Sequence, residues 1–283
     1  MLMDGKELAK DIKAKIKAEI DDIKRIYNVN PTVASILVGD NQASQVYLNS
    51  QIKSYQDLGI GVQKYFFSKE ISEAYLLNLI DKLNKDTEVD GIMINLPLPP
   101  QINATKVLNR IKLIKDVDGF KAENLGLLFQ NSEDFISPST PAGIMALIEG
   151  YKIDLEGKDV VVVGRSNIVG KPVAALVLNN HGTVTICNSH TKNLAEKTKN
   201  ADVLISAVGK PKFITEDMVK EGAVVIDVGI NRVNGKLEGD VDFENVQKKT
   251  SYITPVPGGV GALTVAMLLS NILKSFKANR GII

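Results

Sequence analysis

The segment Asp159–Val163 (DVVVV) constrains the fold of this chain more than any other stretch. An almost wholly apolar run of this length is typical of a strand inside a parallel sheet, with both of its faces covered. Gly164 follows directly, and a helical pattern begins after a short loop, in GRSNIVGKP. In a dinucleotide-binding fold such a turn sets the helix N-terminal amides against phosphate. A single glycine loop is often only a tight turn, so the fold prediction rests on the alternation around it.

Strand and helix patterns alternate in two separate parts of the chain. In the first part, Leu8, Ile12, Ile16, Ile20 and Ile23 form one helical stripe, and further helices are expected after Gly39 and over 72–84. Strands alternating with helices indicate βαβ units. The fold class predicted is therefore α/β, with two α/β domains and a cleft between them, the second a Rossmann-like parallel sheet. The strands expected are Thr32–Val38, 62–67, 91–96, Asp159–Val163, Thr183–Cys187, 203–207, 223–228 and 252–254.

The boundary between the domains is expected in the turn-rich region 115–143. At about 150 residues per domain, 283 residues correspond to roughly two domains. The stretch Pro138 to Pro141 is interpreted as a domain crossing, since proline forbids a continuous helix. The last helix, over 263–276, is apolar on most sides and is expected to return to the first domain. The domains predicted are 1–138 completed by 263–283, and 139–262.

Composition excludes several classes of function. With 34 Lys and Arg against 33 Asp and Glu, a formal net charge of +1 gives no electrostatic footprint for nucleic acid. One cysteine (Cys187) and two histidines (His181 and His190) argue against disulfides, a metal site and a histidine-based triad. No membrane-length apolar run and no signal pattern are found, so a cytoplasmic location is expected.

The second domain is predicted to bind NADP in preference to NAD. An NAD site usually places an acidic residue about 20 residues after the glycine loop, whereas TVTICNSHT contains none. Arg165 and Ser189 could hold a 2′-phosphate instead, because an arginine fork suits a dianion. The plain alternative is a solvent-facing arginine and a turn serine. His190 is interpreted as a loop residue at the adenosine end, and Cys187 as a small core residue.

Seven long segments occur in this order along the chain: VGDNQASQVYLNSQIKSYQDLGI, DGIMINLPLPP, KDVDGF, PSTPAGI, VVVGRSNIVGKP, DVGINR and ITPVPGGVGALTVAML. Through them almost the whole chain resembles the bifunctional methylenetetrahydrofolate dehydrogenase and methenyltetrahydrofolate cyclohydrolase family. The resemblance implies folate in the cleft and NADP on the second domain. It further implies oxidation of methylenetetrahydrofolate by hydride transfer, hydrolysis of the methenyl product to formyltetrahydrofolate in the same site, and a homodimer.

Carried over to this sequence, Tyr47 matches a tyrosine that stacks on the folate, and Asp118 a carboxylate that holds the pterin. An aromatic face suits a flat conjugated ligand, and a carboxylate accepts hydrogen bonds from pterin N–H groups. Taken singly, Tyr47 would be a core ring and Asp118 a turn residue before Gly119. The other matches to folate-lining positions are Ile94, Asn95, Leu96, Pro257, Gly258, Gly259, Val260 and Gly261, and those to cofactor contacts are Gly164, Arg165, Ser166, Ser189 and Ile230.

The sequence departs from the family pattern at three positions. Gln51 stands four residues after Tyr47, where the family has the lysine of the cyclohydrolase step. Asn95 replaces a family glutamine that neighbours this lysine, and Ala262 replaces a proline. A glutamine amide can only hydrogen-bond, whereas a lysine can carry charge and move a proton. Lys53 is two positions further on, roughly 200° around the helix, and is expected to face elsewhere.

The expected function is therefore NADP-dependent methylenetetrahydrofolate dehydrogenase activity, with a weak or absent cyclohydrolase. A full bifunctional enzyme, in which water and Asp118 carry hydrolysis despite Gln51, is the first alternative. A non-catalytic folate- or nucleotide-sensing module is another. A dehydrogenase for a different substrate would leave the Tyr47 and Asp118 motifs unexplained.

Overall fold

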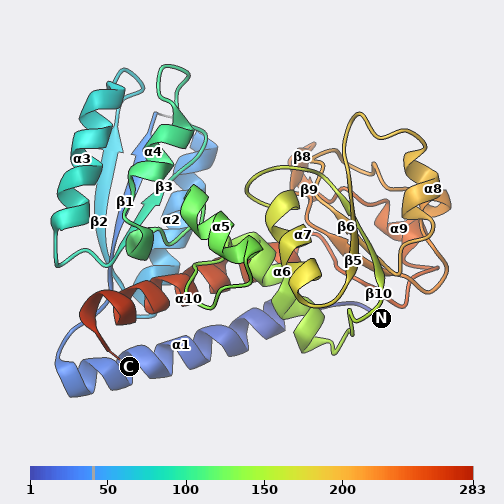
Figure 1. Cartoon of the computed structure of the whole chain (residues 1–283), viewed down its shortest axis with the longest axis horizontal. Helices are drawn as coiled ribbons and strands as arrows, with labels where there is room; N and C mark the ends of the chain where they lie inside the picture. The colour runs from blue at the N-terminus through green and yellow to red at the C-terminus, as the bar shows by residue number, and fades with distance from the viewer. Residues whose placement is uncertain (40–41, 283) are drawn as a thin grey trace. The chain divides into compact units, whose positions relative to one another are not determined.

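The structure is a computed structural model that describes residues 1–39 and 42–282, except for the side chains of residues 42–44, 46 and 47. The chain forms two compact units, both of the α/β class, as predicted (Figure 1). Unit 1 comprises Met1–Asp11, Leu128–Ser132 and Pro138–Met267, and unit 2 comprises Ile12–Leu127, Glu133–Ser137 and Leu268–Ile283. The predicted domain limits of 138 and 263 stay predictions. In the structure residues 1–11 pack with unit 1.

Unit 2 is built on a parallel sheet in the order β2-β1-β3. The strands are β1 (Thr32–Val38), β2 (Gly61–Phe67) and β3 (Gly91–Ile94). One face of β1 packs with buried side chains of α3 (Glu73–Lys85), which begins after the N-cap Ser72 as the sequence pattern predicts. Figure 1 shows α3 running alongside this sheet. The other helices of unit 2, some of which begin or end in unit 1, are α1 (Gly5–Tyr27), α2 (Gln42–Asp57), α4 (Ala104–Arg110), the 3-10 helix η1 (Leu113–Lys115) and α5 (Ala122–Phe129).

The C-terminal helix α10 (Val260–Arg280) begins in unit 1 and ends in unit 2. By length and composition alone it could cross a membrane. In the structure, however, its apolar side chains are largely buried and its polar ones hold unit 2 together. Asn271 Nδ2 donates to the Val117 carbonyl at 2.9 Å, and the buried Ser275 hydroxyl lies within hydrogen-bond distance of the Asp90 carbonyl. The helix is therefore a core element of the folded chain.

Unit 1 contains a five-stranded parallel sheet in the order β10-β7-β6-β4-β5, which confirms the predicted Rossmann-like arrangement. DVVVV forms β4 next to the middle of this sheet, and four of its five residues are buried. The strands are β4 (Asp159–Val163), β5 (Thr183–Cys187), β6 (Val203–Ser206), β7 (Val224–Asp227) and β10 (Tyr252–Ile253). The helices are α6 (Ser139–Gly150), α7 (Gly170–Asn179), α8 (Leu194–Thr198), the 3-10 helix η2 (Glu216–Met218) and α9 (Phe243–Val246).

Two local features were not predicted from the sequence, and the first lies where the chain passes from unit 2 to unit 1. Pro138 is the N-cap of α6, and Pro141 lies in the first turn of this helix instead of interrupting one. Proline is tolerated there because first-turn N–H groups have no intrahelical partner. The hairpin of β8 (Asn231–Val233) and β9 (Lys236–Glu238) was not predicted. Its turn residues Asn234 and Gly235 both have positive φ, which an Asn-Gly pair favours.

Candidate active site

The carboxyl ends of the parallel strands in unit 1 bring the predicted cofactor residues to one edge of the sheet. Because β4 lies between β5 and β6, the strand order reverses here, and such a switch point is where open α/β sheets bind ligands. Gly164 follows β4, and its N–H donates to the Cys187 carbonyl of β5 at 2.9 Å. Ala207 follows β6, and its N–H donates to the Val163 carbonyl at 2.8 Å. The loops after β4 and β6 therefore start side by side.

Two glycines explain why the segment GRSNIVG has the spacing G-x-S-x-x-x-G in place of the generic dinucleotide-binding motif G-x-G-x-x-G. Gly164 has φ +136°, and a Cβ on it would lie 2.5 Å from the Ala207 carbonyl oxygen. A Cβ on Gly170 would lie 2.2 Å from the Gly164 carbonyl oxygen. Both positions need backbone without a side chain, since real Cβ atoms do not approach so closely. The pair lets α7 start directly against the end of β4, in place of the generic glycine motif.

Ser166 corrects the expectation that the N-terminal amides of α7 face a phosphate. Its Oγ accepts the N–H groups of Val169 at 3.1 Å and Gly170 at 3.3 Å, and its carbonyl accepts the Lys171 N–H at 3.0 Å. Pro172 has no N–H, so the start of this helix already has its donors satisfied. A phosphate bound to this edge must be held mainly by loop groups and side chains.

The exposed groups at the same edge suit a 2′-phosphate. Arg165 and Ser189 are both exposed, and they follow β4 and β5, which pair in parallel register up to Val163 and Cys187. No acidic residue stands next to Ser189 in the loop after β5, so no carboxylate of that loop would repel a dianion. His190 is exposed beside Ser189, as expected of a loop residue. Cys187 is fully buried, and burial raises the pKa of its thiol, which fits a core residue.

The glycine turn from Pro257 to Gly261 lies next to Ile230, which was predicted to contact the cofactor. A Cβ on Gly259 would lie 2.7 Å from the Pro255 carbonyl oxygen, so this tight turn requires glycine. Ile230, after β7, is 63% exposed although it is a large apolar residue. Its Cδ1 atom lies 3.5 Å from the position of a Cβ on Gly261. An apolar side chain held beside a glycine turn offers a flat ligand a surface to cover.

In unit 2, Gln51 and Asn95 are buried polar side chains. Gln51 on α2 is 5% exposed, and its Oε1 atom has no hydrogen-bond partner among the residues that the structure describes. Asn95, after β3, is 9% exposed, and both its N–H and its Nδ2 donate to the Ile36 carbonyl, at 2.9 and 3.0 Å. Lys53 is exposed while Gln51 is buried, which confirms that it faces elsewhere. Tyr47 belongs to α2, and its side chain lies outside the described part of the chain.

Asp118 lies beside the end of β3. A parallel bridge between Ile92 and Asp116 brings this segment alongside the strand, and the Ile94 backbone N–H donates to the Asp118 carboxyl. Burial, and secondarily the charge of Asp116, raise the pKa of Asp118 to about 8. Asp116 is itself fixed, since its Oδ2 accepts the Asn124 Nδ2 at 2.7 Å. Near neutral pH the Asp118 carboxyl is therefore largely protonated, but a ligand with several N–H donors would favour its ionised form.

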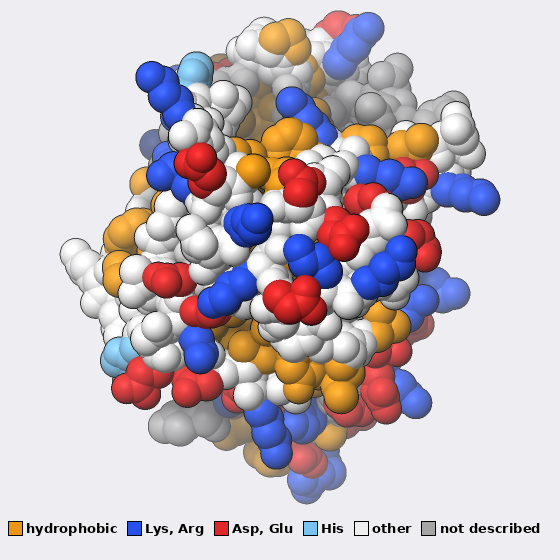
Figure 2. Space-filling view, turned by 90° about the vertical axis from the view of Figure 1, so that its right-hand side faces the viewer, with side chains coloured by type: hydrophobic (Ala, Val, Ile, Leu, Met, Phe, Trp, Pro, Cys, Tyr) orange, Lys and Arg blue, Asp and Glu red, His pale blue; other side chains and the backbone are white. Residues whose placement is uncertain are grey.

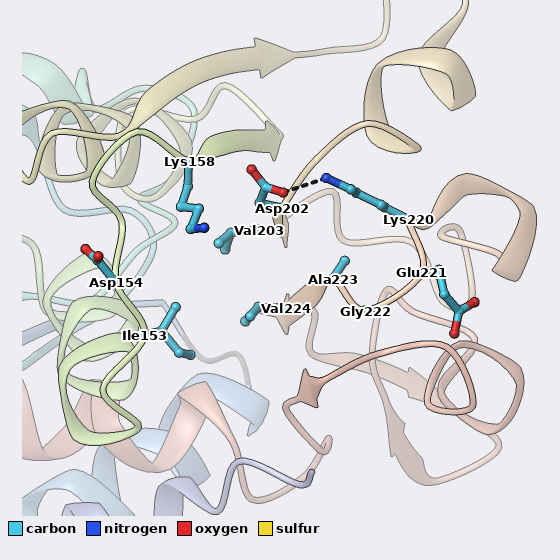
Figure 3. A pocket seen from close by; sticks show the side chains of 10 residues that line it. All are labelled: Ile153, Asp154, Lys158, Asp202, Val203, Lys220, Glu221, Gly222, Ala223 and Val224. Carbon is cyan, nitrogen blue, oxygen red and sulfur yellow. Dashed lines mark hydrogen bonds and ion pairs between the residues drawn. The ribbon is translucent and has the colours of Figure 1, made fainter.

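Unit 1 also has a pocket that is separate from the predicted cofactor residues around Gly164 (Figure 3). It is lined by residues at the amino ends of β4, β6 and β7, which is the edge of the sheet opposite to Gly164 and Ala207. The Lys220 Nζ and Asp202 Oδ1 atoms, 2.6 Å apart, neutralise each other at its rim. Within residues 1–39 and 42–282, no group of three or more His, Cys, Asp or Glu side chains is arranged to hold a metal ion.

Comparison with protein families assigns both parts of the chain. The family model described as "Tetrahydrofolate dehydrogenase/cyclohydrolase, catalytic domain" matches residues 3–118. The model for the NAD(P)-binding domain of the same family matches residues 138–280. The chain belongs to the tetrahydrofolate dehydrogenase/cyclohydrolase family. Its second domain is accordingly an NAD(P)-binding domain.

Close relatives in this family extend over the whole chain. The bifunctional protein FolD of Fusobacterium nucleatum is 89% identical over 283 residues, which cover 100% of both chains. The crystal structure of FolD from Campylobacter jejuni is 48% identical with a TM-score of 0.96, covering 98% of this chain and 99% of that one. FolD of Trypanosoma brucei, solved with NADP and an inhibitor, is 35% identical with a TM-score of 0.94, covering 98% and 97%.

Sequence reasoning named Ser166 only as a cofactor contact and missed its hydrogen bonds to the backbone at the start of α7. It missed Asp240 altogether. Asp240, described below, carries only a weak signal, namely an acidic residue after a glycine in the GDVDF segment. Its partners come from loops far away in the sequence, so spacing alone does not reveal them.

Proposed function

We propose that this chain is an NADP-dependent methylenetetrahydrofolate dehydrogenase whose cyclohydrolase activity is weak or absent. The observation that carries the proposal is Gln51, which is buried at the position of the family lysine and whose amide oxygen finds no partner among the described residues. The dehydrogenase half is supported by the family and by the arrangement of Gly164, Arg165 and Ser189 at the cofactor edge. NADP in preference to NAD rests on the exposed arginine and on the absence of an acid after β5.

The oxidation requires positioned ligands more than acid–base groups. A C–H bond of the methylene carbon breaks with its electron pair, the ring nitrogen supplies electron density to that carbon, and a methenyl cation remains. NADP, when bound, supplies the hydride acceptor. Asp118 would hold the pterin through its N–H groups, and Ile230 with the glycine turn would define where the second ligand lies. Correct placement of two reactants can supply a large part of such a rate enhancement.

The hydrolytic step lacks its usual proton carrier. Attack of water on the methenyl carbon must be accompanied by proton transfer, and the Gln51 amide neither carries charge nor exchanges a proton near neutral pH. Asn95 cannot take over, since its amide nitrogen is committed to the Ile36 carbonyl. Lys53 is exposed on another face of the helix.

The full bifunctional enzyme is a second candidate, favoured by two observations. The relative from Fusobacterium nucleatum is named a bifunctional protein. In addition, a pKa of about 8 would allow Asp118 to exchange a proton near neutral pH.

Hydrolysis of methenyltetrahydrofolate without NADP distinguishes the two candidates. The loss of methenyl absorbance is followed for the wild type, Gln51→Lys and the matched exposed control Lys53→Gln. The wild type and the control are expected to remain near the buffer rate, while Gln51→Lys gains activity. Wild-type hydrolysis well above the buffer rate would overturn the proposal in favour of the bifunctional enzyme. Formation of NADPH from methylenetetrahydrofolate in the same preparation excludes a sensing module.

A cytoplasmic homodimer without nucleic-acid or membrane partners completes the proposal. The net charge of +1 supports the absence of a nucleic-acid partner, and Figure 2 shows acidic and basic side chains interspersed over the face of the molecule in view. Such a mixed surface provides no continuous positive field for a phosphate backbone.

A further inference from the structure

Two buried carboxylates of unit 1 were not among the site residues carried over from the family. Asp227 ends β7 and is 3% exposed, and Asp240 follows β9 and is fully buried. No salt bridge joins either of them to a lysine or arginine among the described residues. A buried charge without a counter-ion requires several hydrogen-bond donors, and their identity shows what each carboxylate holds in place.

Asp240 holds the loop that follows β6 through hydrogen bonds to its backbone. Its Oδ2 accepts the N–H groups of Val208 at 2.7 Å and Gly209 at 3.1 Å. Its Oδ1 accepts the Lys210 N–H at 3.0 Å and the Asn231 Nδ2 at 3.0 Å. One side chain therefore fixes three consecutive amides after β6 and, through Asn231, the loop after β7.

Asp227 in turn fixes Asp240. Its Oδ1 accepts the N–H groups of Asp240 and Gly229, both at 2.9 Å, and its Oδ2 accepts the Val241 N–H at 2.9 Å. The backbone fits closely around both acids. A Cβ on Gly229 would lie 2.2 Å from Asp240 Oδ1, and a Cβ on Gly239 would lie 1.9 Å from Asp227 Oδ2.

The loops held in this way end at the cofactor edge. The loop after β6 begins with Ala207, whose carbonyl oxygen is the atom that a side chain on Gly164 would strike. The loop after β7 carries Ile230 between Gly229, bonded to Asp227, and Asn231, bonded to Asp240. The position of Ala207, which packs against Gly164, and the position of Ile230, which lies beside the glycine turn from Pro257 to Gly261, therefore depend on the same pair of carboxylates.

We infer that Asp240, held by Asp227, is a positioning residue for cofactor binding and hydride transfer, through the loops that carry Ala207 and Ile230. The inference rests on the proposed function, because it assigns a role at the same cofactor edge. Neither carboxylate needs to touch a ligand. Each acts by accepting backbone amides, a task that a neutral amide side chain cannot perform at both atoms.

The test uses Asp240→Asn, with NADP binding measured by calorimetry and oxidation kinetics measured separately. The new amide N–H₂ group would face N–H donors, so the loops must shift. The Kd and KM for NADP are expected to rise about tenfold, corresponding to ~1.4 kcal/mol, with a smaller change in the KM for the folate. Asp90→Asn is the control in the other unit, since Asp90 is a buried aspartate of unit 2 that accepts the Thr32 N–H at 2.9 Å and pairs with Arg280 at 3.0 Å. It should lower Tm and leave NADP binding unchanged.

Unchanged NADP binding in Asp240→Asn, or an equal loss in Asp90→Asn, would overturn the inference and leave a structural role only. If Asp240→Asn does not fold, Asn231→Ala removes one contact of Asp240 at a partly exposed position, and it should raise the Kd for NADP about threefold. An unchanged Kd in this variant would also overturn the inference. Calorimetry reports NADP binding without turnover, so a wild type that binds NADP but forms no NADPH would refute the proposed function alone.

Discussion

Binding of a tetrahydrofolate should release a proton from Asp118. The pKa of this carboxyl is raised to about 8 in the ligand-free structure, so about nine-tenths of the molecules carry the proton at pH 7. A pterin that donates N–H groups to Asp118 favours its ionised form, so binding lowers the pKa of the carboxyl. Affinity should therefore rise with pH and level off above about 8. Between pH 7 and pH 9 the ionised fraction changes about tenfold, which sets the expected change in Kd.

Calorimetry of tetrahydrofolate binding in two buffers of different ionisation enthalpy measures this proton directly. The wild type should release about 0.9 proton at pH 7 and about 0.1 at pH 9. Asp118→Asn has the same shape but no titration, so its proton release gives the contribution of all other groups. Equal proton release by the two proteins at pH 7 would refute the assignment of Asp118 as a pterin-binding carboxylate.

The same raised pKa has a consequence for stability, and its sign is opposite to that of an ion-paired acid. Between about pH 4 and pH 8 folded Asp118 keeps a proton that the unfolded chain has lost, so its contribution makes the free energy of unfolding fall as pH rises. Asp118→Asn should remove this part of the pH dependence. Urea unfolding of both proteins at pH 5 and pH 9 measures the effect, and identical pH dependence in both would contradict it.

Three further predictions concern the cofactor loop and the core. Arg165→Ala should raise the KM for NADP about tenfold or more and leave that for NAD nearly unchanged, because only NADP carries the 2′-phosphate. Gly170→Ala should lower the free energy of unfolding by about 1–3 kcal/mol and weaken NADP binding, since its Cβ would lie 2.2 Å from the Gly164 carbonyl oxygen. Gly126→Ala, with open space around it in α5, should be neutral or stabilising by comparison. Lys115→Met should lower the free energy of unfolding by about 1–3 kcal/mol, because the buried ammonium donates to two backbone carbonyls; equal urea midpoints would contradict this.

The elements that sequence reasoning predicted well are those with a strong local pattern. Asp159–Val163 and Thr183–Cys187 are strands with the bounds expected from the sequence. Short helices such as α4 and α5 were not predicted, because seven or eight residues carry too little periodicity to distinguish them from loops. Helix α6, which begins directly after Pro138, was not predicted either. The Asn234-Gly235 turn was a recognisable hairpin signal that the prediction omitted.

The sequence by itself determined the fold class, the family resemblance and the replacement of a lysine by Gln51, because these depend on residue types and local order. Only the tertiary structure decided what surrounds those residues. It shows that the Gln51 amide oxygen has no partner within the described part of the chain and that Ser166 occupies the donors at the start of α7. It also shows that burial, and secondarily a neighbouring charge, raise the pKa of Asp118. Asp240 likewise acquires its partners from two loops that meet only in the folded sheet. Hydrogen bonding and desolvation depend on groups distant in the chain, and for that reason no local pattern in the sequence reports them.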